Sequence, residues 1–424
     1  MISLLKILFP INRSLTGVGN IKSLKIIKNV CKNLKIKFFK SGKKVYDWRI
    51  PEEWNVKNAF IINPSGEKIC NFKKNNLHLV GYSLPIKKKI TLSLLKKKLH
   101  TLKNYPTAIP YVTSYYKKYW GFCIKYNEFK KLKKGMYEVF IDSKFKKGKM
   151  HYGEILIKGK SKKEIFLSSY ICHPSMANNE LSGPVVLAYV SKWLDNLSKK
   201  NKLNYSYRIL FIPETIGSIA YLNKNLNYLK KYIIAGYNIS CVGDNEIYSY
   251  IPSKYGNSIS DKVYQSVLKK NKKKFKIYHW NERGSDERQY CAPFVDLPIG
   301  TITRSKFGKY KEYHTSEDNY EKVVSQKGLL GSLKYLKQTL QILEKKQFPS
   351  TTVLCEPFLT KYNLYPTLSF FKKKITNSQD ILNILTWCDG KNDLLEISKK
   401  SKININIIKK NLKTLTKQKL VKIY

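Results

Sequence analysis

The sequence has little arginine, no long apolar run and no closely paired cysteines. Only six of its 80 basic residues are arginine, so lysine supplies nearly all of the net charge of +51. No stretch approaches the roughly 18 uncharged apolar residues that cross a bilayer, so no membrane span is expected. The apolar N-terminus is interrupted by Lys6 and stopped by Pro10, and it has no cleavage site. It therefore predicts a packed helix rather than a signal peptide.

The eight cysteines are irregularly spaced and contain no CxxC pair. This spacing favours buried free thiols in a reducing cytoplasm over a disulfide framework or a zinc ribbon. With 42% hydrophobic and 13% aromatic residues, the chain has the composition of a folded globular protein. We therefore expect a soluble cytoplasmic protein of two or three domains.

The lysines are spread along the whole chain. Two interpretations stay open: lysines solvated on every face, or a basic surface for nucleic acid or anionic glycans. The rare arginines are more informative, because three of the six fall between Arg283 and Arg304.

Three regions of the sequence differ in their hydrophobic pattern. The first forty residues have helical spacing, and residues 45–154 hold short β-type runs separated by turns, which predicts an inserted β-rich module. Residues 155–347 alternate strand-like runs with helical ones. Together with residues 1–44 they predict an α/β domain with a mostly parallel sheet and helices on both faces. Residues 350–424 predict three short helices and a strand, a winged-helix-like unit that binds DNA or docks proteins.

Polar residues follow the predicted strands, where an open α/β sheet usually binds its ligand. His173 follows the first strand, Glu214 the second and Asp244 the third, and a fourth segment supplies Asp286 and His314. Two histidines and one glutamate suit a zinc ion, with a further carboxylate as general base. Taken singly, each histidine is weak evidence, because a lone histidine is more often structural than a metal ligand.

Several longer segments carry a family resemblance: "DWRIPEEW", "YSLPI", "AIPYVTSYY", "SSYICHPSMANNELSGP", "PETIGSIAYL", "GSDERQYCAP" and "EYHTSEDN". They resemble the zinc-dependent aminopeptidases that bind two metals on an α/β sheet. More closely, they resemble bacterial aminopeptidase-like domain proteins with an inserted β-rich module and a C-terminal winged helix. That group is often encoded among polysaccharide-biosynthesis genes. The resemblance spans residues 8–319, with the C-terminal unit in addition.

The resemblance implies roles for individual residues. His173 matches the first histidine ligand of the peptidases, Glu214 their single glutamate ligand and His314 their last histidine ligand. Asn179 stands where the peptidases have an aspartate that bridges two metals. Ser240 stands where another aspartate ligand would lie.

Three departures from the peptidase pattern argue against a two-zinc site. The amide of Asn179 is neutral, so it does not bridge two cations as a carboxylate does. Ser240 removes a metal ligand, and Pro213 replaces the general-base glutamate. We therefore expect either one zinc ion with Asn179 or a nearby carboxylate assisting, or no metal in a retained pocket. The acids that could replace the missing base are Glu180, Asp244 and Asp286.

The segment "RGSDERQY" has two interpretations. It is either a surface turn or a substrate-facing loop in which Arg283 or Arg288 pairs with a carboxylate or phosphate of the substrate. The aromatic residues of the inserted module are expected to form its core rather than a sugar platform. These residues are Tyr82, Tyr115, Tyr116 and Trp120.

The leading hypothesis is a metal-dependent, aminopeptidase-like hydrolase that cleaves an amide in a small peptide-like or amino-acylated substrate. The link to surface polysaccharide synthesis rests on the resemblance alone. The alternative is a non-enzymatic binding or regulatory protein with a degenerate peptidase pocket. Nucleic-acid binding by the winged helix is less favoured, because that unit has no arginine. A homo-oligomer stays open.

Overall fold

The largest sheet of the protein is mixed and has eight strands. The computed structural model describes residues 1–365 and 376–424. The strand order is β1-β10-β12-β11-β13-β16-β14-β15. Their bounds are β1 Lys35–Lys40, β10 Lys149–Ile157, β11 Glu164–Tyr170, β12 Ser206–Ile212, β13 Ile233–Ile239, β14 Tyr248–Ile251, β15 Phe275–Ile277 and β16 Ile299–Thr303. The four central strands, β12, β11, β13 and β16, are parallel neighbours. The fold class is confirmed as α/β.

Two details of the predicted pattern are wrong. Helical spacing was expected through the first forty residues, but Lys35–Lys40 is a strand that pairs antiparallel with β10. Strand β10 also begins at Lys149, six residues before the expected start of the α/β region at residue 155. Both strands extend the sheet at the edge formed by β1 and β10, and in Lys35–Lys40 tertiary pairing outweighs local helical spacing.

The central strands are buried on both faces, and their side chains alternate between two cores. Ile165 and Leu167 of β11 belong to one apolar cluster, whereas Phe166 between them belongs to the other. This follows from the period of two along a strand. The two charges within these strands are satisfied, because Arg208 makes a bidentate pair with Glu164 at 2.7 and 2.9 Å.

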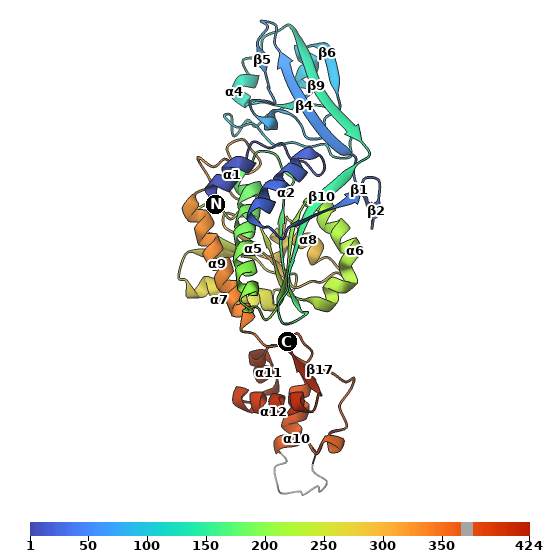
Figure 1. The fold of residues 1–424 in the computed structure, drawn as a ribbon. Helices are drawn as coiled ribbons and strands as arrows, with labels where there is room; N and C mark the ends of the chain where they lie inside the picture. Colours follow the sequence, from blue (N-terminus) through green and yellow to red (C-terminus); the bar gives the residue numbers. More distant parts are fainter. Residues whose placement is uncertain (366–375) are drawn as a thin grey trace.

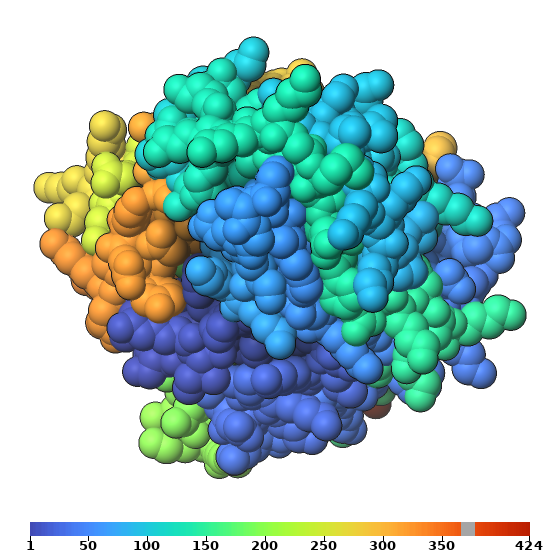
Figure 2. Space-filling model, turned by 90° about the horizontal axis from the view of Figure 1, so that it is seen from above, coloured from blue at the N-terminus to red at the C-terminus, as the bar shows by residue number. Residues whose placement is uncertain are grey.

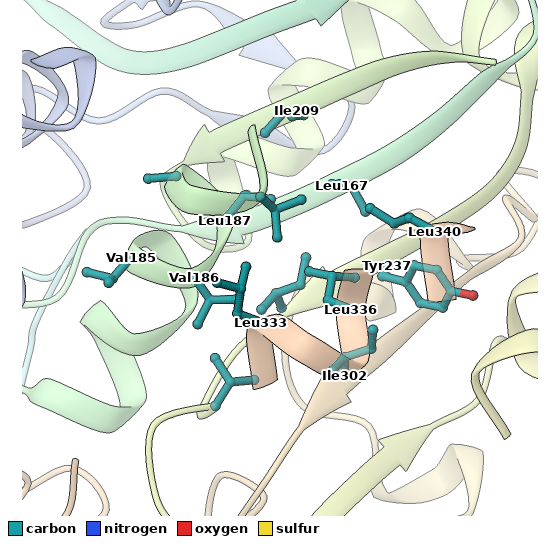
Figure 3. Close-up of a cluster of buried hydrophobic side chains, with 14 of the residues drawn as sticks. Leu167, Val185, Val186, Leu187, Ile209, Tyr237, Ile302, Leu333, Leu336 and Leu340 are labelled. Atoms are coloured by element: carbon teal, nitrogen blue, oxygen red, sulfur yellow. The ribbon is translucent and has the colours of Figure 1, made fainter. Parts of the chain in front are cut away.

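Helices cover both faces of the sheet (Figure 1). Their bounds are α1 Ile2–Leu8, α2 Val18–Val30, α5 Ser182–Lys199, α6 Ile216–Tyr232, α7 Ile259–Lys270, α8 Glu287–Tyr290 and α9 Gln326–Glu344. Residues of α1, α2, α5, α7 and α9 fill the first cluster, and residues of α6 and α8 the second. Figure 3 shows the first cluster, where Leu167 and Ile209 of the sheet face Val186 of α5 and Leu336 of α9.

The inserted region forms a sheet of its own, with strand order β5-β4-β9-β6. The main bounds are β4 Glu53–Ile62, β5 Lys68–Ile69, β6 Ile86–Thr91 and β9 Met136–Lys146. Shorter elements of the region are β2 Lys44–Val45, β3 Trp48–Arg49, α3 Leu92–Lys96, β7 Leu99–His100, β8 Phe122–Cys123 and α4 Tyr126–Phe129. The region covers one end of the α/β domain, as the view from above in Figure 2 shows.

The C-terminal unit is a small helical domain closed by a two-stranded sheet. Its elements are β17 Pro349–Thr351, α10 Thr376–Thr386, α11 Leu394–Ser401, α12 Ile405–Lys417 and β18 Val421–Ile423. Strands β17 and β18 pair antiparallel, and Ile381, Ile397 and Leu412 lie in a separate apolar core. The predicted three helices and terminal strand are present.

Two further findings bear on the sequence expectations. In the described parts of the chain, no helix combines the length and apolarity that a bilayer crossing needs. All eight cysteines are free thiols, and Cys355 alone among them is exposed.

Replacing Leu336 by alanine should lower the free energy of unfolding of the α/β domain by about 2–4 kcal/mol, because a buried leucine leaves a cavity. Leu336 is 1% exposed, whereas Leu330 on the same helix is 47% exposed. Leu330→Ala is therefore the matched control and should change stability by less than about 0.5 kcal/mol. Urea unfolding followed by circular dichroism measures both, and equal losses would contradict the core assignment.

Candidate functional site

His173 lies in the loop after β11 and is held by buried charges. Its Nδ1 atom is 2.8 Å from Oε2 of Glu180. The Arg13 guanidinium lies 3.3 Å from Oε1 of Glu180 and donates to the main-chain oxygen of His173 at 2.9 Å. Burial acts to lower the pKa of His173, but the neighbouring Cys172 and Glu180 raise it well above its ordinary value. With Nδ1 engaged, the Nε2 atom is left to face the site.

Glu180 is carried by a single π-helical turn, Ala177–Leu181, directly before α5. Such turns are frequent at functional sites. The carboxylate was expected as a candidate base. In the structure it is fully buried between Arg13 and His173, a geometry that favours orientation of the histidine over proton transfer to a substrate.

Glu214 and His314 approach the other side of the His173 ring. Oε2 of Glu214 lies 3.6 Å from Nε2 of His173, and the ring centroids of His173 and His314 are 5.6 Å apart. Burial, followed by the charge of His173, lowers the pKa of His314 to about 3, so this imidazole is neutral. Ser285 donates to Oε1 of Glu214 at 2.9 Å. The structure therefore places two of the expected ligands, Glu214 and His314, beside the third, His173.

The backbone is strained at two points of this group. Thr215, directly after Glu214, has φ +62°, and His314 has φ +56°. Neither residue is a glycine, and Thr215 is β-branched, so both conformations are costly unless the surroundings impose them. Such outliers cluster at binding and catalytic sites.

The inserted region supplies part of the site. The amide of Tyr111 donates to the main-chain oxygen of His314 at 2.8 Å, and that of Ser316 to the oxygen of Ile109 at 2.9 Å. The Tyr111 ring lies 5.4 Å from the ring of His173 and 5.1 Å from that of His314. Sequence reasoning missed Tyr111, although it belongs to the quoted segment "AIPYVTSYY", because nothing local distinguishes it from the other aromatic residues of the module.

Asn179 has its oxygen occupied by a neighbour in the chain. The Tyr170 hydroxyl lies 2.9 Å from Oδ1 of Asn179 and 2.6 Å from Oγ of Ser240. Within the described residues, the buried Nδ2 of Asn179 has no hydrogen-bond partner. The expectation that Asn179 assists a metal is not supported, since its oxygen already accepts from Tyr170. A second cation does not fit among these three neutral groups.

Asp318 is a buried acid that sequence reasoning missed. Its carboxylate accepts from the amides of Asn178 and Asn179 at 2.7 and 2.9 Å and from Tyr310 at 2.9 Å. Burial raises the pKa of Asp318 to about 6, while these hydrogen bonds oppose the shift. The residue holds the start of the π-helical turn. In the sequence it follows His314 in "HTSEDN", which also reads as an exposed acidic turn.

The two remaining candidate bases differ in their surroundings. Asp244 accepts from Asn178 and from Ser305 at 3.2 and 2.9 Å, so both its oxygens are engaged. This geometry favours a structural role. Asp286 accepts from the Thr215 amide at 2.7 Å through Oδ1, but its buried Oδ2 has no partner among the described residues. Burial, with the charge of Glu214, raises the pKa of Asp286 to about 8.

The structure separates the two candidate arginines. Arg288 donates to Oγ1 of Thr215 and to the main-chain oxygen of Ser285, both at 3.0 Å. It thus lies at the exposed edge of the Glu214 turn. Arg283 is exposed and stacks on Trp280, with 5.1 Å between the guanidinium carbon and the ring centroid. Within the described residues Arg283 makes no hydrogen bond or ion pair with the site, so its predicted substrate role is not supported.

The donor set suits one zinc ion. Zinc sites use imidazole nitrogens and carboxylate oxygens, and His173, Glu214 and His314 offer three such groups with a neutral His314. A closer group, Cys172, His173 and Glu180, has ligand atoms within 4.8 Å of one another. It gathers at Nδ1 of His173, where Glu180 makes its hydrogen bond, and is better explained as the support of the histidine.

Sequence comparison places the chain in a family. Residues 2–346 match the family model described as "Domain of unknown function (DUF4910)". The chain belongs to this family. Residues 347–423 match a winged helix-turn-helix model. Across 422 residues the chain is 40% identical to a Clostridium acetobutylicum protein named "Putative polysaccharide biosynthesis protein with aminopeptidase-like domain", covering 99% of this chain and 95% of that one.

Solved structures confirm the resemblance to aminopeptidases at the level of the fold. The crystal structure of a "putative peptidase" from Clostridium acetobutylicum is 39% identical, with a TM-score of 0.79 over 100% of this chain and 95% of the other. A zinc aminopeptidase from Bacillus subtilis is 12% identical, with a TM-score of 0.57 over 80% of this chain and 94% of that one. This DUF4910 member therefore has an aminopeptidase-like fold with a winged-helix unit.

The buried Asp286 predicts a pH dependence in the metal-free protein. The folded state keeps the proton of Asp286 up to about pH 8, whereas the unfolded chain loses it near the ordinary pKa of 3.8. Wild-type stability should therefore fall as pH rises through this window. Asp286→Asn removes the titration, so its melting temperature relative to wild type should rise between about pH 4 and 8.

The exposed Asp47 offers the control. Asp47→Asn should change the melting temperature little at either end of the pH range, because substitutions of exposed residues usually alter stability by less than about 0.5 kcal/mol. Thermal melts in EDTA measure all three proteins. A pH-independent difference between Asp286→Asn and wild type would contradict a raised pKa.

Proposed function

We propose that this protein is a metal-dependent, aminopeptidase-type hydrolase that cleaves an amide bond in a small amino-acylated or peptide-like substrate. The observation that carries the proposal is the convergence of Nε2 of His173 with the Glu214 carboxylate and the His314 ring. The homologue named for polysaccharide biosynthesis supports a substrate linked to surface polysaccharide synthesis.

One zinc ion is the cofactor that these residues suit. When bound, zinc supplies Lewis-acid chemistry, which polarises a carbonyl group and makes water more acidic. His173, Glu214 and His314 would hold it, while Glu180 and Arg13 keep the His173 ring in place.

Asp286 is the candidate acid–base group that the geometry favours. It is buried beside the Glu214 turn, and its pKa is raised to about 8, which suits proton exchange near neutral pH. Its second oxygen has no partner among the described residues. Arg288, at the exposed edge of the same turn, is placed to pair with an anionic group of the substrate.

Metal analysis tests the proposal directly. After zinc loading and desalting, the wild-type protein should retain about one zinc ion per chain. Catalytic zinc sites are typically formed by three protein ligands, with the fourth position left for water or substrate. His173→Ala and His314→Ala should retain little, and the exposed His279→Ala should behave as wild type. A wild-type content below about 0.2 ions per chain would refute the hydrolase proposal, since the reaction depends on the ion.

Activity against a panel of aminoacyl 4-nitroanilides supplies the second readout. Zinc-loaded protein should release nitroaniline, and the His314→Ala variant should be slower by about a hundredfold or more. Zinc bound at full occupancy without turnover would favour the alternative of a ligand-binding or regulatory protein. The winged-helix unit at residues 347–423 is the observation that favours this alternative.

Tyr111 should set the zinc affinity through its contact with both histidine rings. Tyr111→Ala should weaken zinc binding by about tenfold, as is usual when a residue supporting a ligand is removed. Tyr111→Phe keeps the ring and loses only the 3.3 Å contact with the Tyr115 hydroxyl. It should bind zinc as wild type does in competition with a chromophoric chelator; equal loss in both variants would contradict a role for the ring.

A further inference from the structure

A second hollow lies far from the site, at the junction of the α/β domain with the winged-helix unit, where Figure 1 places the C-terminus. It has a volume of about 910 Å³ and lies between the loop before β11, the end of α9 and β18. Seven of its fifteen lining residues are lysine, whereas lysine and arginine together make up 80 of 424 residues in the chain. We call this hollow the junction groove.

The positive charge of the junction groove is not balanced by its own acids. The one acidic side chain in the lining, Glu344, accepts from the Tyr207 hydroxyl at 2.7 Å and from the Asn204 amide at 2.6 Å. Lys346 pairs with Asp393 of the winged-helix unit. In the described residues no acid lies within ion-pair distance of the other six lysines: Lys160, Lys162, Lys163, Lys231, Lys345 and Lys422.

Lys163 is the lysine of the junction groove whose surroundings most disfavour its positive charge. Its ammonium group is partly buried and donates to the main-chain oxygen of Lys231 at 3.1 Å. Burial, with the charges of Lys391 and Lys231, lowers the pKa of Lys163. A second groove, of about 640 Å³, shares Lys163 and Lys231 and adds Lys391 and Lys400 of the winged-helix unit, together with the acids Asp296, Asp389 and Glu396. Like charges thus meet around Lys163 from both domains.

We propose that the junction groove binds a small ligand that carries a diphosphate group. Lysine ammonium groups bind phosphate as point charges, and the volume lies in the range of small-molecule sites rather than of a polymer track. Tyr205, Tyr232 and Tyr424 supply aromatic walls beside the lysines. Because Lys160 belongs to the α/β domain and Lys422 to the winged-helix unit, such a ligand holds the two domains together. The proposal does not depend on hydrolase activity.

Titration calorimetry of the full chain with inorganic pyrophosphate tests the proposal. Binding should saturate at one equivalent and raise the melting temperature. The double variant Lys163→Ala/Lys231→Ala should bind at least about tenfold more weakly, a loss of about 1.4 kcal/mol. Lys162→Ala/Lys422→Ala, at exposed positions of the groove, should weaken binding in the same direction without loss of folding.

The control is Lys87→Ala/Lys88→Ala, which removes the same charge from exposed positions on β6. It should leave the affinity within about twofold of wild type, because screening limits distant charges. Two results would overturn the proposal: equal weakening by all three double variants, or binding that does not saturate at one equivalent. Either would mean that pyrophosphate is attracted by the net charge of the protein and not by the groove.

Two competitors define the ligand further. A nucleoside diphosphate that displaces pyrophosphate from the wild type but not from Lys163→Ala/Lys231→Ala would support the diphosphate class. A 20-base-pair DNA duplex that displaces pyrophosphate at a lower concentration than the nucleotide, with a steep salt dependence, would overturn it in favour of a nucleic-acid surface.

Discussion

The buried contact between Arg13, Glu180 and His173 is the interaction on which the rest of the site depends. Arg13 comes from the segment between α1 and α2, His173 from the loop after β11, and Glu180 from the π-helical turn before α5. A buried charge is costly unless it is paired, and loss of one partner of such a pair typically destabilises a protein by about 3–5 kcal/mol. The contact therefore fixes three segments at once and aims one histidine nitrogen into the site.

The site is completed from outside the α/β domain. The main-chain contact of Tyr111 with His314 joins the inserted region to the loop that carries the last histidine. The positive φ of His314 is maintained by this pairing, because an isolated loop would relax from a strained conformation. On the opposite side, the Tyr170 hydroxyl occupies the oxygens of Asn179 and Ser240, so the space that two carboxylates would need is filled by neutral groups. Donor groups thus lie beside Nε2 of His173, whereas the groups around Asn179 are neutral and bonded to one another.

Much of the fold was predictable from periodicity, and the site less so. The fully buried strand Glu164–Tyr170 contains the apolar run at residues 165–167, and parallel strands bring their carboxyl ends to one edge of the sheet. This placed His173 and Glu214 together. The strand Lys35–Lys40 was missed because an edge strand is formed by its neighbour rather than by its own pattern. Asp318 was missed because an acid in a loop gives no local sign of burial.

The sequence by itself determined the parallel α/β core, the helical C-terminal unit, the histidine and glutamate donors and the loss of the bridging carboxylate at Asn179. These depend on residue type and on spacing along the chain, except for the role of Asn179, which the resemblance to the aminopeptidases implies. Only the tertiary structure decided that Glu180 supports His173, that one oxygen of Asp286 has no partner among the described residues, and that a few lysines among so many meet at one junction. Each of these depends on burial and on distances between segments far apart in the chain, and neither quantity is encoded in local spacing.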